Sequence, residues 1–172
     1  IIENPRRSIK DLSASENNQT TQAVFEKLIQ SEKDYIKEYL QSNKHNLAEK
    51  YSLTMTPSRI DIVATCYVKN SMDIGKVIKK IKSYYDEIKK VELYFFKNHD
   101  INIVLEEDAI DFIIEQLIVS SIGLNDVYQK IEKDFEHGLK LAREKTGRNR
   151  FFITRKAVLD PEGYVGDLII EV

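Results

Sequence analysis

Residues 52–85 read SLTMTPSRIDIVATCYVKNSMDIGKVIKKIKSYY, and residues 102–135 read NIVLEEDAIDFIIEQLIVSSIGLNDVYQKIEKDF. The two stretches align without a gap at a constant offset of 50, with six identities in 34 positions. Apolar positions correspond even where the residues differ, as Leu53 corresponds to Ile103. A matched apolar pattern at a fixed period indicates a structural repeat of one supersecondary unit.

Each copy begins with a predicted strand and a helix start. Alternating apolar residues at 53–55 and 101–105 are typical of short strands. Thr56 before Pro57 suits the N-cap and first position of a helix. In the second copy the acidic run 106–108 suits the positive end of a helix dipole, an explanation we favour over a metal or acid–base site.

A second, longer helix follows in each copy, after breaks at 70–71 and 120–121. The apolar stripe of the first predicts a helix from about Ile74 to Phe96, which ends one unit and introduces the next. The stripe of the second predicts a helix that runs to Lys145 and stops at the C-cap glycine, Gly147.

The flanks complete a mostly helical α+β fold of two similar helix–strand–helix–helix units. Residues 1–22 are polar and are expected to be a linker or arm, with a helix that begins near Thr20 or Thr21. The first unit then covers residues 23–75, and its opening helix carries two adjoining apolar faces. The second covers residues 76–172. Its predicted last elements are a strand at 151–154, a helical turn at 155–159, a break at 160–163 and an amphiphilic tail.

The composition gives no sign of a nucleic-acid or membrane protein. The 26 basic and 28 acidic residues leave a net charge of −2, which provides no global field for a polyanion. No apolar stretch approaches the ~20 residues of a membrane span, and no signal peptide is evident, so we expect a cytoplasmic protein.

No complete catalytic, cofactor or metal motif is found in the sequence. The glycine-rich loop that cradles a triphosphate is missing. His45, His99 and His137 are far apart in sequence, so no zinc motif is expected. Cys66, the single cysteine, lies in an apolar run and is expected to be buried and inert. We therefore predict no catalytic, cofactor-binding or metal-binding residue in this chain.

One local concentration of positive charge stands out around the last predicted strand. It is either a solvated rim or a contact to an acidic partner surface or a nucleotide phosphate. Its members are Lys145, Arg148, Arg150, Arg155 and Lys156.

Residues 76–165 resemble the small C-terminal (lid) domain of AAA+ ATPases of the Clp and HslU unfoldase type. The long helix ends in Phe95-Phe96, and the run DINIVLEEDAIDFI at 100–113 looks like the strand and acidic helix start of that family. The strand RFFIT at 150–154 and the order helix, strand, helix, helix, strand match the lid layout. The phrase REKTGR at 143–148, continued through Asp160-Pro161-Glu162, looks like a variant group of bacterial Clp-like ATPases.

The resemblance implies a non-catalytic region that couples nucleotide state to subunit packing. In that family the large ATPase domain, which binds ATP and Mg²⁺, lies upstream in the same polypeptide and packs on lids of neighbouring subunits in a hexamer, to which a peptidase can dock. The family places a sensor arginine in a Gly-x-Arg setting. Here Gly123 is followed by Leu124 and Asn125, so no ATP-binding residue is carried over.

Two other functions remain open from the residues themselves. The chain begins at Ile1 without an initiator Met, which suggests a piece of a larger protein, whereas a Met directly before Ile1 would favour a stand-alone helical binding or scaffolding module. A nucleic-acid binder that uses the basic rim from Arg148 to Lys156 is the weakest alternative.

Overall fold

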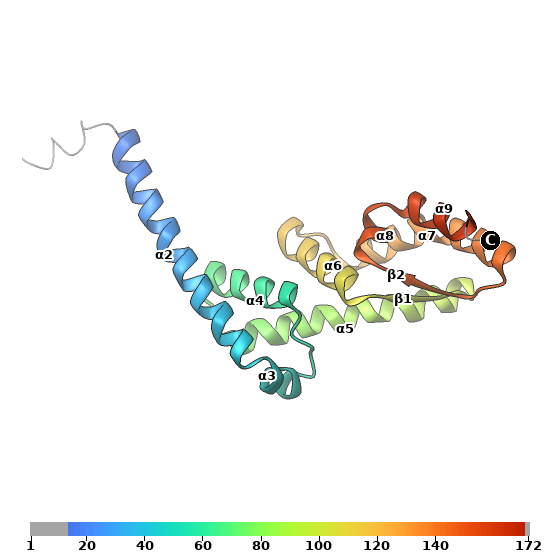
Figure 1. The fold of residues 1–172 in the computed structure, drawn as a ribbon, viewed down its shortest axis with the longest axis horizontal. Helices are drawn as coiled ribbons and strands as arrows, with labels where there is room; N and C mark the ends of the chain where they lie inside the picture. Colours follow the sequence, from blue (N-terminus) through green and yellow to red (C-terminus); the bar gives the residue numbers. More distant parts are fainter. Residues whose placement is uncertain (1–13, 171–172) are drawn as a thin grey trace, which may run out of the picture.

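The computed structural model describes residues 14–170, and of these 82% are helical (Figure 1). The mostly helical α+β class is confirmed, with eight helices and two short parallel strands in the described part. The elements follow one another as α2 (Ala14–Ser42), α3 (Lys44–Tyr51), α4 (Pro57–Asn70), α5 (Ile74–His99), β1 (Asn102–Leu105), α6 (Glu107–Ser120), α7 (Leu124–Thr146), β2 (Arg150–Ile153), α8 (Arg155–Leu159) and α9 (Pro161–Ile170).

The helices of the two aligned stretches keep the offset of 50 in the structure. The first and last residues of α4 correspond to those of α6, and the first residue of α5 corresponds to that of α7. Ser71 and Ser121 end α4 and α6 in the same left-handed conformation, with φ of 48° and 51°. Thr56 and Glu106 precede the two helices with the same extended backbone, although only the Thr56 side chain accepts a helix N–H.

The strand predicted at residues 53–55 is wrong, because this extended segment has no strand partner among the described residues. Leu53 and Met55 are still buried, as are Ile103 and Leu105 at the equivalent positions. The difference lies in pairing, since β1 pairs in parallel with β2 and no third strand lies beside residues 53–55.

The first helix differs from its prediction at both ends. It begins at Ala14 instead of Thr20 or Thr21, so residues 14–22 of the predicted arm are helical, and residues 1–13 lie outside the described part. It ends at Ser42, and Leu47 belongs to a separate helix, α3. Asn43 makes the break, because its side-chain amide donates to the carbonyl of Tyr39 while its backbone leaves the helical region.

The C-terminal elements follow the prediction closely. Gly147 ends α7 with φ of 73°, a left-handed conformation that favours glycine, and β2 begins at Arg150. The break predicted at 160–163 is limited to Asp160, because helix α9 begins at Pro161. This helix packs along α7. Gly138 permits this contact, because a Cβ there would lie 2.7 Å from a methyl group of Val165.

The long helix α5 runs through the fold and is contacted by elements on both sides of it in the sequence (Figure 1). Helix α4 packs against it together with α3, and α6, β1 and α7 also contact it. Helix α2 packs on α4 through its C-terminal half, while its N-terminal half projects away from the other elements (Figure 1). The core includes Leu40, Val63, Ile78, Ile88, Phe95, Ile101, Ile110, Ile114, Phe135, Leu139 and Ile153.

Candidate functional site: a groove and an apolar helix face

The predicted basic rim is divided by strand β2. Lys145 in the last turn of α7, Arg148 and Arg150 lie at the start of the strand, whereas Arg155 and Lys156 lie beyond its end at the start of α8. Four strand residues span about 13 Å, so the five cations do not meet in one patch. The arrangement gives the nucleic-acid alternative no continuous cationic track.

Two of the rim arginines rest on aromatic rings. Arg150 lies over Phe152, 5.3 Å from its centroid, and Arg155 lies over Phe112 at 5.2 Å. The backbone N–H of Arg155 also donates to Asp108, one of the acidic residues at the start of α6. These contacts help to hold β2 and α8 in place.

The acidic helix start of α6 belongs to a buried network that joins the two units. Arg59 of α4 is fully buried and donates to Asp111 and Glu107 at 2.8 Å each, and to the carbonyl of Thr54. The Tyr85 hydroxyl donates to the other oxygen of Glu107. Sequence reasoning missed this network, because an arginine in an apolar helix start gives no signal of burial.

Burial and hydrogen bonding shift the pKa values within this network in different directions. Burial raises the pKa of Tyr85 to about 12, helped by its bond to Glu107. Burial also raises the pKa of Asp111, against the opposing effect of Thr56 and Arg59. For Glu107, burial is outweighed by the bonds from Arg59 and Tyr85, and the pKa falls. Because the donors of Arg59 are engaged, the network acts as a structural link.

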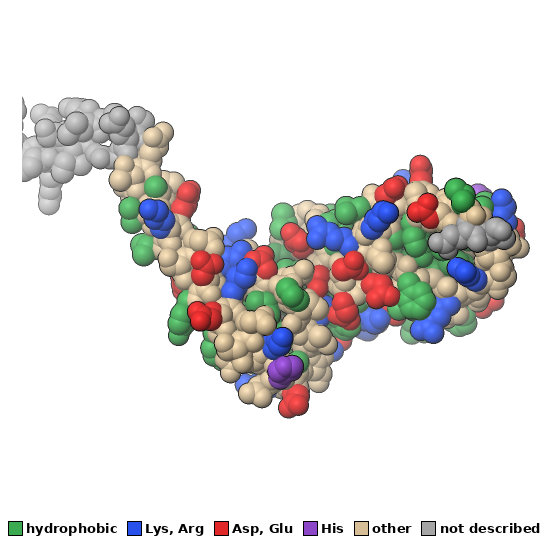
Figure 2. Space-filling model, viewed as in Figure 1, with side chains coloured by type: hydrophobic (Ala, Val, Ile, Leu, Met, Phe, Trp, Pro, Cys, Tyr) green, Lys and Arg blue, Asp and Glu red, His purple; other side chains and the backbone are tan. Residues whose placement is uncertain are grey.

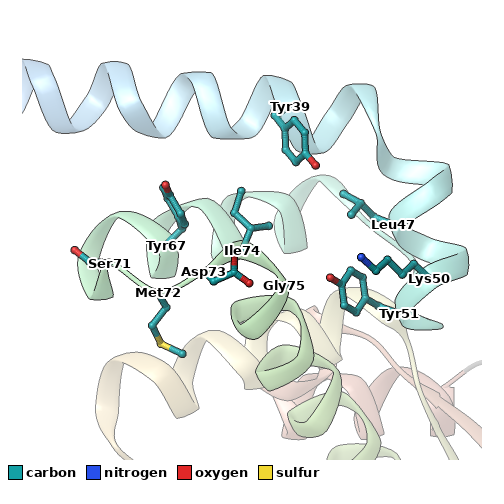
Figure 3. Close-up of a pocket in the computed structure, with 10 residues that line it drawn as sticks. All are labelled: Tyr39, Leu47, Lys50, Tyr51, Tyr67, Ser71, Met72, Asp73, Ile74 and Gly75. Carbon is teal, nitrogen blue, oxygen red and sulfur yellow. The ribbon is translucent and has the colours of Figure 1, made fainter.

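An open groove of about 510 Å³ lies where α2, α3, α4 and α5 meet (Figure 3). Figure 3 shows Tyr39 hanging from α2 and Tyr67 standing up from α4, with Tyr51 at the α3 side. Gly75 leaves room for this arrangement, since a Cβ there would lie 2.8 Å from the Tyr51 hydroxyl. The complete lining is Tyr39, Leu47, Lys50, Tyr51, Tyr67, Ser71, Met72, Asp73, Ile74 and Gly75.

A row of exposed apolar side chains runs along α2 (Figure 2) and leads into this groove. We call it the α2 stripe, and Tyr39 belongs to both features. Leu28 is 64% exposed and Tyr35 70% exposed, whereas Ile36 and Leu40 on the adjoining face are buried against the core. The members of the α2 stripe are Val24, Phe25, Leu28, Tyr35 and Tyr39.

Helix α2 also carries several acidic side chains. Its Lys33 and Lys37 both lie 3.1 Å from Asp61 of α4, which balances one of their two charges. Lys27 is the one remaining basic residue of α2. The exposed acidic residues of this helix with described side chains are Glu26, Glu32, Asp34 and Glu38.

The sequence did place two apolar faces on this helix, but it did not show which one would be covered. A helix that has a second apolar face, beside the face that packs on the core, is typical of a helix that contacts an additional partner. The other residues considered from sequence lie apart from the groove. Cys66 is buried, and burial raises its thiol pKa.

No family model, curated protein or solved structure matches this chain. No helix in the part that the structure describes is long and apolar enough to cross a bilayer.

Proposed function

We propose that this chain is a helical protein-binding module, and that the α2 stripe and its groove hold an amphipathic helix of a partner. The observation that carries the proposal is the second apolar face of α2, which remains exposed while the first is buried. A row of exposed apolar side chains that leads into a groove is typical of an interaction site.

The spacing of the α2 stripe favours a helix as the occupant. Five positions of α2 follow one another at alternating steps of three and four residues, which is the spacing of a seven-residue repeat. They are Phe25, Leu28, Glu32, Tyr35 and Tyr39, and four of the five are apolar. Apolar residues at this spacing form the contact seam between two packed helices. The groove at the Tyr39 end accepts a large side chain from the end of such a helix.

The charge around the α2 stripe favours a basic partner. Glu32 lies within the seam, and Glu26, Asp34 and Glu38 are exposed on the same helix. The basic residues of α2 are Lys27 and the two lysines that share Asp61. Lysine or arginine beside the apolar positions of the partner would pair with these carboxylates and guide association. A second copy of this chain would instead bring acidic faces together.

A displayed library of helical peptides tests this proposal without a known partner. The library carries apolar residues at seven-residue-repeat positions and randomised flanking positions. We expect selection for lysine and arginine flanks, and we expect Leu28→Glu to weaken binding of a selected peptide at least tenfold. Fluorescence anisotropy measures the affinity.

Leu159→Glu is the matched control, because Leu159 is 61% exposed and lies on α8, away from the α2 stripe. It should leave peptide affinity unchanged. Selection of acidic peptides, or equal losses in the two variants, contradicts the proposal. A dimer in sedimentation that Leu28→Glu dissociates would assign the α2 stripe to a second copy and would also contradict it.

The AAA+ lid, which the sequence alone favoured, is our second candidate. The observation that favours it is the order α5, β1, α6, α7, β2, in which the two strands pair in parallel around a two-helix crossover. On this proposal the chain belongs with an ATPase domain of the same polypeptide, in a hexamer to which a peptidase can dock. ATP and Mg²⁺ would bind to that domain.

No nucleotide contact is proposed for the chain itself under either function. Asp126 accepts the N–H of Gly123 at 3.0 Å, so an acidic side chain stands next to the position expected for a sensor arginine. Sequencing the reading frame upstream of Ile1 tests the lid proposal. A phosphate-binding loop within that frame supports it, and an uninterrupted frame without one contradicts it.

A further inference from the structure

Three metal-ligating side chains meet where the end of α5 lies against α7. They are His99, the last residue of α5, and Glu132 and Glu136, one helical turn apart on α7. One ligand atom from each lies within 4.8 Å of the others. The Nε2 atom of His99 is 2.7 Å from Glu132 Oε1, and its Nδ1 atom is 3.4 Å from Glu136 Oε1.

The cluster is held in place by the packing and hydrogen bonds around it. The His99 side chain is 9% exposed and its ring packs on the buried Phe95 at a centroid distance of 4.9 Å. The Tyr128 hydroxyl donates to Glu132 at 3.2 Å, and Lys140 lies 2.6 Å from Glu136. Hydrogen-bonding partners of this kind orient the side chains that bind the ion in metal sites.

We propose that His99, Glu132 and Glu136 form a site for one divalent transition ion of the zinc class. An imidazole nitrogen and two carboxylate oxygens are ligands that Zn²⁺ accepts, whereas Mg²⁺ and Ca²⁺ prefer oxygen alone. Three protein ligands leave a fourth position for water. The ion would add positive charge beside two carboxylates, of which Glu136 is already paired with Lys140.

The site would fasten the C-terminus of α5 to the middle of α7. Binding requires a ring nitrogen without a proton, so the ion would take the place of a proton at the nitrogen of His99 that it binds. Histidine spacing along the sequence does not reveal the site, because a single histidine combines with two glutamates 33 and 37 positions further along the chain.

Titration with Co²⁺, a spectroscopic substitute for Zn²⁺, tests the proposal on the untagged, chelator-treated protein. We expect visible absorption bands that saturate at one ion per chain and that Zn²⁺ abolishes by competition. His99→Gln should abolish the bands, and Glu132→Gln should weaken binding at least tenfold. Tyr128→Phe should weaken it by about ten- to a hundredfold through lost positioning of Glu132.

Two variants serve as controls for ions that bind elsewhere. His45 is exposed on α3, and Glu144 is exposed on α7 outside the cluster, so His45→Gln and Glu144→Gln should bind Co²⁺ as the unmodified protein does. Melting in chelator checks that each variant folds. If His99→Gln does not fold, the Co²⁺ affinities of Glu132→Gln and Tyr128→Phe still test the proposed site.

Three results would overturn the proposal and leave the cluster as an ion pair. They are no saturable Co²⁺ binding, binding that survives His99→Gln in a folded protein, and an equal loss in His45→Gln. A matching response to Mg²⁺ in competition would also count against a zinc-class site.

Discussion

The aligned aspartates of the two units, Asp61 and Asp111, occupy the same position of the same helix in very different surroundings. The Asp61 side chain is 47% exposed and is held by two lysines of α2. The Asp111 side chain is 5% exposed and is held by the buried Arg59 and by Thr56. Local sequence therefore sets the helix and its boundaries, while the neighbouring element decides whether the shared carboxylate is a surface or a core group.

Arg59 also shows that aligned residues of the two units have different partners. Its aligned residue is Ala109, and both are fully buried. The first unit thus sends a guanidinium into the second, where Asp111 and Glu107 receive it. In the first unit, Lys33 and Lys37 of α2 supply the cations for Asp61 instead. The two equivalent aspartates are therefore paired by different helices.

The largest loss of stability is expected when Arg59 is replaced by alanine, which is the residue at the aligned position 109 of the second unit. Asp111 would be left buried without its cation, which costs about 3–5 kcal/mol of the free energy of unfolding. Urea denaturation measures the loss. Arg150→Ala is the control, because that arginine lies over an exposed ring and should cost less than about 1 kcal/mol. Equal losses would show that Asp111 does not depend on Arg59.

The two helix starts should respond differently to alanine. Thr56 accepts the N–H of Arg59 and donates to Asp111 at 2.6 Å, so Thr56→Ala should cost about 1–2 kcal/mol in chemical denaturation. Glu106 makes no side-chain cap bond, and Glu106→Ala should stay within about 0.5 kcal/mol of the unmodified protein. If Glu106→Ala lost as much stability as Thr56→Ala, the two side chains would contribute equally to their helix starts, which would contradict this prediction.

A smaller, pH-dependent effect is expected at Asp61. Burial raises its pKa, but Lys33 and Lys37 outweigh burial and leave it below the ordinary value of 3.8. The folded state therefore gains stability from the charged form above pH 3.8, and this gain is lost as the pH falls through the lowered pKa. Asp61→Asn should cost under about 1 kcal/mol at pH 7, because the pair is half exposed. Melts at pH 7 and near pH 3 should show the difference shrink; a constant difference would contradict this origin.

Tyr85 gives the most specific signal. Its aligned residue is Phe135, so Tyr85→Phe makes the two aligned positions identical. With a pKa of about 12 against an ordinary 10, Tyr85 contributes stability below pH 10 that is lost as the pH rises to 12. Among nine tyrosines, alkaline titration by phenolate absorbance should lose one late step in Tyr85→Phe, while a step from Tyr164 near 12 remains. An unchanged late phase would contradict this assignment.

The sequence predicts those parts of the fold that local chemistry fixes. The proline after Thr56, the serines at 71 and 121 and the glycine at 147 mark helix ends that the structure keeps. The sequence could not show that residues 53–55 form no strand, because the alternating pattern is the same whether or not a partner strand lies alongside. The break at Asn43 depends on a single side-chain bond to the backbone.

The candidate site was less predictable than the fold. Two apolar faces on α2 are visible in the sequence, but only packing shows that Ile36 and Leu40 are covered while Leu28 and Tyr35 are not. The basic rim appeared as one cluster because its members are close in sequence, and β2 separates them in space. The groove combines residues from four helices, which no local pattern connects.

Hydrogen exchange along α2 tests the central claim most directly. All side chains from residue 18 to residue 28 are exposed in the free chain, so their amides should exchange rapidly. With a selected basic helical peptide bound, we expect protection across residues 18–39 and at the groove, and no protection in Leu28→Glu. Protection confined to other elements, such as β2 or α9, with α2 unchanged would contradict the account.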